Sequence, residues 1–384
     1  MAKRKLKRAN QEGSAFQLKN GSWRAQITLD GKRLSFSALS QGECRDWIRK
    51  MLNKVDAGLT YEVMQITLAE YLHDWLANAK TTIRFTTFEQ YQQITRDYIK
   101  PLLGNVKVFE LRPEHVQHLY ATHLQNGASA RTVRMVHCVV HRSLNQAVQM
   151  GLIDRNPASF VKPPRLKRKE MKFYDEGQVQ ALLITAEAAQ DRYLALWKVA
   201  VTTGMRMGEL LGLKWVDLDW SKGYLQVRRQ LKVTRGGGFH FAEPKSKAGL
   251  RAIVLGLDTL SLLKVHQDQL HQERVQLGDR WKEQDLIFPS SVGTPTRPGK
   301  ILVRFKRLIK LAGLPEIRFH DLRHTAASLM LNNGIPLIVV SRRLGHAQPS
   351  ITLNVYGHMI PMMQEQAAEL MDKITAPISI QFPS

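Results

Sequence analysis

The start of the chain shows first a strand-like and then a helix-like spacing of apolar side chains. Apolar and polar residues alternate over residues 23–29, the pair Asp30-Gly31 supplies a hairpin turn, and a second strand follows over residues 32–36. A capping box at Ser40 then begins a helix whose apolar residues share one face. The pattern predicts a small three-stranded sheet backed by a helix.

The two faces of this predicted sheet differ in polarity. Side chains at the odd strand positions would form its core, which leaves polar side chains on the outer face. These outer residues are Arg24, Gln26, Thr28 and Arg33. A two-stranded ribbon fits the major groove of DNA, so this face either binds DNA or is an ordinary solvated surface, and the basicity of the segment favours binding.

Residues 64–158 follow the helical period. A capping box begins the first helix at Thr67, a second helix is expected to stop at Pro101, Pro113 opens a third, and a long fourth ends before Gly151. Four helices joined by short loops predict a bundle.

A basic, proline-containing segment follows the bundle. Its basic residues are Lys162, Arg165, Lys167, Arg168 and Lys169. We expect this segment to be a stiff linker between domains that lies along a phosphate backbone.

The remainder, from about residue 171, begins with helices, passes through short strands between 223 and 255, and returns to helices. The predicted fold class is therefore multidomain α+β, in which a mainly helical domain with a small antiparallel sheet follows the sheet-plus-helix and four-helix modules. We expect domains at residues 1–60, 64–160 and 173–384, with the linker at 161–172.

The charge of the chain indicates a polyanionic partner. Lys and Arg number 56 against 33 Asp and Glu, which gives a net charge of +23. An excess of this size favours nucleic acid, because each phosphate that is neutralised releases a condensed counterion. The first ten residues contain five basic and no acidic side chains, and form either a phosphate-binding arm or a solubilising tail.

Other classes of protein fit less well. The uncharged run at residues 324–341 is interrupted by Pro336 and cannot span a membrane, and the charged N-terminus has no apolar stretch of the kind found in signal peptides. Cys44 and Cys138 are too few for a disulfide framework or a thiolate zinc site, which fits a reducing cytoplasm, with the protein on the nucleoid. We expect both cysteines to be small buried side chains in helices.

Four motifs in the last region carry candidate chemistry. They are TGMRMGEL over 203–210, EPKSKAG over 243–249, HDLRH over 320–324, and LGH over 344–346, the last preceding Tyr356 by ten residues. We expect Arg206 at a helix N-terminus, where backbone donors favour an anion, and His320 and Arg323 on one face of a helix. The second motif would place two lysines at the tip of a β-hairpin.

Each of these side chains alone is most often a solvated or half-buried group, but the ordered set is suited to phosphodiester transfer without a metal. Arginines hold non-bridging oxygens through two hydrogen bonds, a cation protonates the leaving oxygen, and a hydroxyl supplies the nucleophile.

With these motifs in this order, the chain resembles the tyrosine recombinases, specifically the integrases of phages and integrative elements. The resemblance covers nearly the whole chain, with an arm-type DNA-binding domain similar to residues 14–56, a core-binding domain and a catalytic domain. It implies a catalytic set of Arg206, Lys245, His320, Arg323, His346 and Tyr356. Counting back from Arg251 favours Lys245 as the lysine, with Lys247 as the alternative.

The resemblance also implies a mechanism. Tyr356 attacks the phosphate, His320 accepts its proton or stabilises the phenolate, and Lys245 protonates the departing 5′ hydroxyl. The 3′-phosphotyrosyl link conserves the bond energy, so no cofactor, ATP or metal is expected. Glu209 would orient a neighbouring base or cap its helix.

Partners follow from the same resemblance: double-stranded DNA at core and arm attachment sites, a homotetramer on DNA, and a host DNA-bending protein and an excisionase. The alternating apolar residues at 378–382 would either pass to a neighbouring protomer or form an edge strand on their own sheet.

Three other functions share parts of this pattern. His320 and His324 have the spacing of a zinc protease helix, but Asp321 stands at the position of the glutamate, and Arg323 would place a positive charge beside the ion. A type IB topoisomerase uses the same kind of tyrosine, although the arm domain argues against it. A non-catalytic DNA-binding regulator would not need the complete catalytic set.

Overall fold

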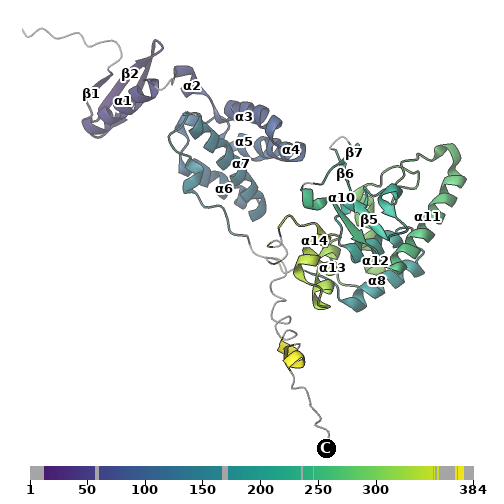
Figure 1. Cartoon of the computed structure of the whole chain (residues 1–384). Coiled ribbons are helices and arrows are strands. Elements are labelled where there is room, and N and C mark those ends of the chain that lie inside the picture. The colour runs from purple at the N-terminus through teal and green to yellow at the C-terminus, as the bar shows by residue number, and fades with distance from the viewer. Residues whose placement is uncertain are drawn as a thin grey trace, which may run out of the picture. The chain divides into compact units, whose positions relative to one another are not determined.

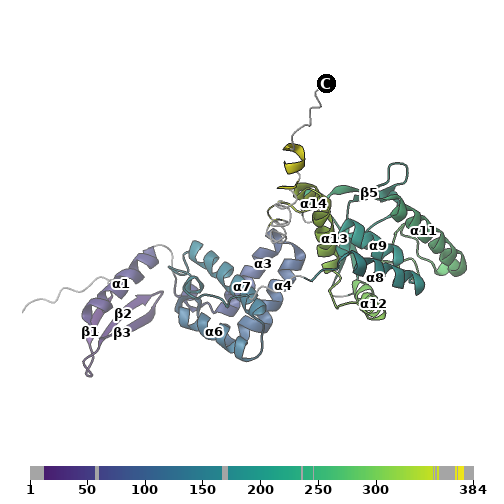
Figure 2. The same cartoon turned by 90° about the horizontal axis from the view of Figure 1, so that it is seen from below.

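The chain divides into two compact units, Met1–Arg168 and Lys169–Ser384 (Figures 1 and 2). The computed structural model describes residues 13–56, 60–166, 172–234, 237–244 and 246–348, together with residues 350, 353, 368–369 and 371–375. Several predicted features lie outside the described residues: the basic arm at 1–10, Lys167, Arg168, Lys169, Lys245, Tyr356 and the tail at 378–382.

The first unit opens with the predicted sheet. Its strands β1 (Ser14–Gln17), β2 (Trp23–Leu29) and β3 (Lys32–Ala38) are antiparallel in the order β1-β2-β3, and α1 (Gln41–Asp56) packs beside them (Figure 1). Asp30 and Gly31 both have positive φ, 49° and 74°, as a two-residue hairpin turn requires. Ala25, Ile27 and Leu29 are buried beneath α1, so the predicted core is confirmed.

A helical bundle follows in the same unit. Its helices are α2 (Tyr61–Gln65), α3 (Leu68–Thr82), α4 (Phe85–Ile94), α5 (Lys100–Leu103), α6 (Pro113–Gln125) and α7 (Ala130–Gln149). The capping box at α3 is present, because the Thr67 hydroxyl accepts from the Glu70 N–H at 3.3 Å and the Glu70 carboxylate accepts from the Thr67 N–H at 2.9 Å. The bundle has its own apolar core, which includes Leu72, Leu119 and Leu144.

The predicted stop at Pro101 is wrong. A π-helical stretch, Thr95–Ile99, joins α4 to α5, and the helix continues past the proline to Leu103. Within this stretch the Lys100 N–H donates to the carbonyl of Thr95, five residues earlier. Pro101 then stands in the first turn of α5, where a missing N–H is tolerated.

The prediction of two buried cysteines is half wrong. Cys44 is fully buried in α1, whereas Cys138 is exposed on α7. α7 turns Val136, Val139 and Val140 toward the core, and at 3.6 residues per turn Cys138 falls on the opposite side.

The second unit is the predicted mainly helical domain with small antiparallel sheets. Its helices are α8 (Glu176–Ala188), α9 (Leu194–Thr203), α10 (Met207–Leu210), α11 (Leu257–Leu277), α12 (Pro298–Leu311), α13 (Asp321–Asn332) and α14 (Leu337–Leu344). Its strands are β4 (Leu218–Asp219), β5 (Tyr224–Val227), β6 (Gln230–Val233), β7 (Phe239–Ala242) and β8 (Arg251–Val254), in sheets ordered β4-β5-β8 and β6-β7.

A buried tryptophan organises the core of this unit. Trp197 of α9 lies 5.6 Å from the ring of Phe305 of α12 and 6.0 Å from that of Phe319, measured between ring centroids. Phe319 stands directly before α13. This packing holds α9 against α12 and against the N-terminal end of α13, where the predicted catalytic residue His320 stands.

The lysine motif is not the tip of a hairpin as predicted. β7 pairs with β6 and β8 pairs with β5, so residues 243–250 connect strands of two different sheets and contain a 3₁₀ turn, Lys247–Gly249. The hairpin closes earlier, where the Thr234 N–H donates to the Gly238 carbonyl at 2.9 Å and Gly237 has a φ of 78°. Glycine adopts this backbone conformation without strain, so the tight turn forms there.

Candidate active site

Arg206 stands at the start of a helix, as predicted. α9 ends at Gly204, whose φ of 63° suits glycine, and Arg206 is the N-cap residue of α10. Its backbone N–H donates to the Glu209 carboxylate at 3.1 Å, and its guanidinium donates to the same carboxylate at 2.8 Å. The Arg206 side chain is 42% exposed, so its guanidinium is held in place yet open to a ligand.

Glu209 is the buried partner of two arginines. Its side chain is 3% exposed and accepts from Arg206 and, at 3.0 Å, from Arg251. Burial by itself would raise the pKa of Glu209, but the charges and hydrogen bonds of Arg251 and Arg206 outweigh it, and the pKa lies below its ordinary value. An ionised carboxylate therefore anchors the TGMRMGEL motif from beneath.

Arg323 reaches from α13 back to the end of α9. The residue is 4% exposed, and its guanidinium donates to the Gly204 carbonyl at 2.8 Å. A Cβ added at Gly204 would collide with the Leu344 side chain of α14 and lie 3.3 Å from the Cβ of Ala326. Glycine is therefore needed here both for its φ and for the close approach of α13 and α14.

His320 is the N-cap residue of α13, and its ring lies 5.5 Å from the ring of His324, with the two planes at 89°. Between them Asp321 is buried and accepts from the Arg318 guanidinium at 2.8 Å and from the Arg318 N–H at 2.8 Å. This carboxylate is occupied in holding the helix start, which is unlike the free glutamate of a zinc protease.

His346 follows a glycine turn at the end of α14. Gly345 has a φ of 72°, and the His346 N–H donates to the Ser341 carbonyl at 3.1 Å. The turn is tied to α9 as well, because the Arg343 guanidinium donates to the Thr202 carbonyl at 3.1 Å. The LGH motif is thereby docked against the end of α9.

The two predicted catalytic histidines share one electrostatic environment. The pKa of His346 is lowered to about 4, mainly by burial and then by the charges of Arg323 and Arg206. The pKa of His320 is lowered by burial, then by His324 and Arg323. Both imidazoles are therefore neutral at pH 7, so His320 is able to accept a proton and His346 to donate a hydrogen bond without a net charge.

The structure thus brings together Arg206, His320, Arg323 and His346, drawn from three distant motifs. The other two predicted catalytic residues, Lys245 and Tyr356, lie outside the described residues. For the alternative, Lys247, the structure describes the backbone of its 3₁₀ turn.

Comparison with known proteins decides the family. The model of the Phage integrase family matches residues 172–361, and the model of the phage integrase N-terminal SAM-like domain matches residues 67–124. The chain belongs to the phage integrase family. It is a tyrosine recombinase, an enzyme that cuts and rejoins DNA at specific sites.

Named relatives extend along nearly the whole chain. A tyrosine recombinase XerC-like protein of Caldanaerobacter subterraneus subsp. tengcongensis is 28% identical over 385 residues, covering 93% of this chain and 98% of the relative. The ICEBs1 integrase of Bacillus subtilis is 24% identical over 369 residues, covering 94% of this chain and 100% of the relative.

Solved structures share the fold. The Tn1549 transposon integrase in complex with transposon right end DNA gives a TM-score of 0.68 at 19% identity, covering 81% of this chain and 100% of that one. A lambda integrase tetramer bound to a Holliday junction gives 0.55 at 18% identity, covering 90% of this chain and 96% of that one.

Sequence reasoning missed two arginines of this integrase. Arg251, which was used above only to locate the predicted catalytic lysine by its distance in the chain, is buried and donates a hydrogen bond to Glu209. Arg343 donates a hydrogen bond to the last turn of α9. Their partners lie 42 and 141 residues away, so no local spacing could have indicated either contact.

The predicted DNA-binding residues that the structure describes, Arg24, Gln26, Thr28, Arg33, Lys162 and Arg165, are exposed or partly exposed. In the sheet, Arg24 pairs with Ser37 and Thr28 with Arg33 across β2 and β3, on the face opposite the buried row. Thr28 and Arg33 are exposed, whereas Arg24 and Gln26 are partly covered. In the linker, Lys162 and Arg165 are exposed, and the Arg134 guanidinium donates to the Pro164 carbonyl at 3.3 Å.

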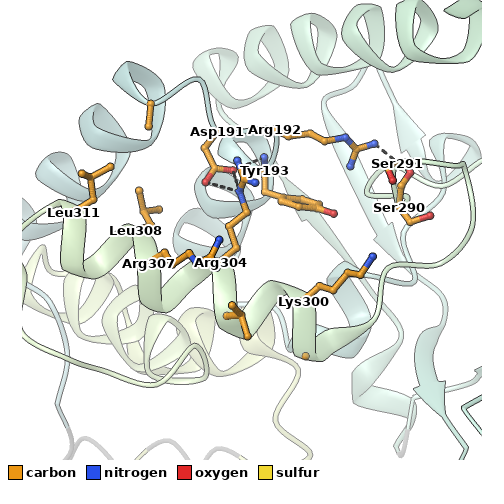
Figure 3. Close-up of a pocket in the computed structure, with 13 residues that line it drawn as sticks. Asp191, Arg192, Tyr193, Ser290, Ser291, Lys300, Arg304, Arg307, Leu308 and Leu311 are labelled. Carbon is orange, nitrogen blue, oxygen red and sulfur yellow. Dashed lines mark hydrogen bonds and ion pairs between the residues drawn. The ribbon is translucent and has the colours of Figure 1, made fainter. Parts of the chain in front are cut away.

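A cavity of about 680 Å³ lies elsewhere on the integrase, beside α12 (Figure 3). It is lined by Asp191, Arg192, Tyr193, Lys300 and Arg304, among others, and by none of the predicted catalytic residues. Arg304 donates to Asp191 at 2.9 Å, as Figure 3 shows. Arg192 lies near the N-terminal end of α9, which at 1.5 Å per residue is about 15 Å from Gly204.

In the described ranges, no cluster of three or more His, Cys, Asp or Glu side chains is arranged to hold a metal ion. Among the described helices, none combines the length and the apolar character needed to cross a membrane.

Proposed function

We propose that this integrase inserts and removes a mobile element by joining two attachment sites through a 3′-phosphotyrosyl intermediate on Tyr356. One observation carries the proposal: the TGMRMGEL, HDLRH and LGH motifs converge on the turn at Gly204. A group of two arginines and two neutral histidines matches the charge of a phosphodiester in its transition state.

Arg206 and Arg323 hold the scissile phosphate in this proposal. The exposed guanidinium of Arg206 faces the DNA, and Arg323 supports the turn that carries it. Planar guanidiniums donate to two oxygens at once, which orients the phosphate for in-line attack. His346 donates a further hydrogen bond.

The chemistry then proceeds in two balanced steps. The Tyr356 oxygen forms a bond to phosphorus while the bond from phosphorus to the 5′ oxygen breaks. His320 takes the tyrosine proton, and Lys245, or Lys247 in its place, gives one to the leaving 5′ oxygen. The 5′ hydroxyl of the other duplex then attacks the phosphotyrosine and gives its proton to the lysine, while the bond from phosphorus to the tyrosine oxygen breaks and His320 returns the proton to the tyrosine. One phosphoester replaces another, so the steps need no energy source.

The remaining parts bind DNA. We assign arm-site binding to residues 1–60, core-site binding to residues 64–160 with the linker at 161–172, and catalysis to residues 173–384. A net charge of +23 supports this division of labour, as do the exposed basic residues Arg33, Lys162 and Arg165. The solved structure of the Tn1549 integrase is a complex with DNA, and that of the lambda integrase is a tetramer bound to a Holliday junction, which favours a homotetramer on DNA here. We further propose a host DNA-bending protein and an excisionase as partners.

A suicide substrate tests the proposal. The direct repeats in the DNA that flanks the gene define the crossover site, and a nick beside it traps the covalent adduct. The wild type should form the adduct in EDTA and exchange strands between two sites, which a topoisomerase or a regulator would not do. Tyr356→Phe should bind the same DNA and form no adduct, and adduct formation by this variant would move the nucleophile elsewhere.

A further inference from the structure

Arg251 is the first residue of β8. Of the two arginines that contact Glu209, it is the more deeply buried. Its side chain is 7% exposed, so it does not reach the surface on which DNA would lie. Each of its three nitrogens has a separate acceptor: Nε donates to the Arg343 carbonyl at 2.6 Å, Nη1 to the Gly249 carbonyl at 3.1 Å, and Nη2 to the Glu209 carboxylate at 3.0 Å.

These three acceptors belong to three motifs of the active site. Glu209 holds the guanidinium of Arg206, Arg343 stands three residues before His346, and Gly249 ends the turn that follows the lysine motif. One buried guanidinium therefore joins segments that are 42 and 92 residues away from it in the chain.

The packing at Gly345 shows how closely these segments meet. A Cβ added to Gly345 would lie 2.8 Å from Arg251 Nη1 and 2.9 Å from the Ala248 carbonyl oxygen. The turn that carries His346 is thus seated directly on Arg251 and on the backbone that follows the lysines. Any movement of Arg251 would be passed to the position of His346.

We propose that Arg251 is a positioning residue of the recombination reaction, which sets Arg206 through Glu209 and His346 through the Arg343 carbonyl. This inference rests on the proposed function of the site. Arg251 does not touch the phosphate; it fixes the distance between two groups that do.

The choice of arginine follows from this geometry. A lysine would retain the pair with Glu209, but its single nitrogen could not also donate to the carbonyls of Arg343 and Gly249. A neutral side chain would leave Glu209 with Arg206 alone, and the released carboxylate would draw the guanidinium of Arg206 inward. The positive charge of Arg251 is also one of the causes that lower the pKa of His346, after burial, Arg323 and Arg206.

The alternative is that Arg251 only stabilises the fold. Arg192 provides a matched control, because it makes the same kind of contacts at the other end of α9. It donates to Glu273 at 2.8 and 2.7 Å and to the carbonyl of Pro289 at 2.8 Å. It also donates to the carbonyl of Ser290 at 3.2 Å (Figure 3). Replacing either arginine by methionine removes a guanidinium that bridges a carboxylate and another segment.

The experiment compares Arg251→Met, Arg251→Lys and Arg192→Met in the full chain on the nicked suicide substrate. We expect Arg251→Met to cleave about 100-fold more slowly than Arg192→Met, the loss typical of reacting groups displaced by about 1 Å. The dissociation constant for core-site DNA should be unchanged. Arg251→Lys should recover part of the rate, and equal rates for Arg251→Met and Arg192→Met would overturn the proposal.

A double-mutant cycle of Arg251 and His346 distinguishes positioning from a purely structural role, because only positioning makes the two losses of cleavage rate depend on each other. If Arg251 acts by positioning His346, its replacement should cost little more once His346→Ala is present, so the two losses should be far from additive. Full additivity would contradict the proposal. If Arg251→Met does not fold, the same double-mutant cycle is measured with Arg251→Lys and His346→Ala. Absence of adduct from the wild type would instead refute the proposed function, so the two failures remain distinct.

Discussion

The two units of this integrase differ in whether the charged side chains of their ion pairs are exposed or buried. Among the described residues of Met1–Arg168, the buried polar side chains are Thr95, Ser143 and Asn156, all of them uncharged. Its ion pairs are exposed, as in Arg96–Asp97 at 65% and 36%. The unit Lys169–Ser384 buries four carboxylates, each paired with an arginine: Asp191, Glu209, Asp217 and Asp321.

This difference reflects what each unit has to do. An apolar core fixes a shape, and its side chains tolerate exchange for others of similar volume. A buried ion pair rarely adds stability, since the cost of removing both charges from water is large, but it fixes directions between named atoms. The second unit therefore uses buried ion pairs to fix directions between side chains, both at Glu209 beside Arg206 and away from it at Asp191, while the described ion pairs of the first unit stay exposed.

The largest expected effect is the loss of cleavage activity when a single lysine of the second unit is replaced. Lys245→Ala removes the proposed proton donor and should slow cleavage roughly 10²–10⁴-fold while leaving DNA binding by both units intact. A bridging 5′-phosphorothiolate makes a leaving group that needs no proton, so this substrate should restore cleavage by the variant. Measured in parallel, Lys247→Ala should show no such rescue, and the reverse result would transfer the role to Lys247.

The arginine clamp should come next in size. Arg206→Lys and Arg323→Lys keep the charge but lose the planar pair of donors, so cleavage should fall roughly 10²–10³-fold in single-turnover assays. Arg323→Lys should also lower thermal stability, because Arg323 is buried and supports the Gly204 turn. Near-normal cleavage by either variant would remove that residue from the clamp.

The sequence predicted the parts of both units that depend on neighbouring residues. The Asp30-Gly31 turn, the Thr67 capping box and the helix start at Arg206 are local, and each was confirmed. The errors at Pro101 and at the lysine motif arose because a π turn and a change of strand partner are set by packing elsewhere in the fold.

Residues with distant partners escaped prediction. Arg251 gains its importance from acceptors in α10 and α14, which no period in the sequence brings near β8. The candidate catalytic motifs, by contrast, were recognised because their residue types are unusual in combination.

Surface charge in the first unit should produce a smaller, salt-dependent effect. Arg33→Gln removes an exposed cation from the sheet face, so the slope of log affinity against log salt for arm-site DNA should decrease by about 1, the value for one lost phosphate contact. Cleavage at a core site should not change. The matched control is Arg45→Gln, an equal loss of charge on the exposed side of α1, which should bind arm-site DNA as the wild type does. Equal losses of affinity in both variants would mean that only net charge matters.

The smallest expected effect is a loss of folding stability at acidic pH that arises from His266, the buried histidine of α11. Burial is the main cause that lowers the pKa of His266 to about 4. Between pH 6.5 and 4 the unfolded chain binds the extra proton, so stability is lost as the pH falls through this window. From His266 alone the free energy of unfolding of the second unit should be about 2 kcal/mol lower at pH 5 than at pH 7.

Urea denaturation of the full chain at both pH values checks this prediction. His266→Gln retains a donor for the Ile287 carbonyl, which the histidine ring nitrogen approaches at 2.7 Å, but it cannot titrate. The variant should therefore lose less stability than the wild type between pH 7 and pH 5. An identical loss in both proteins would assign the acid sensitivity to other groups.

The π-helical stretch Thr95–Ile99 has a consequence for how such a bundle changes over evolutionary time. The buried residues Ile94 and Ile99 are five positions apart, one more than an α-helix would place between neighbours on one face, yet both point into the core. The stretch therefore absorbs a single extra residue without rotating the rest of the helix. Chains that differ in length by one residue at this place could encode the same bundle, so gaps in the comparison of related integrases should be tolerated here before anywhere else in α4 or α5.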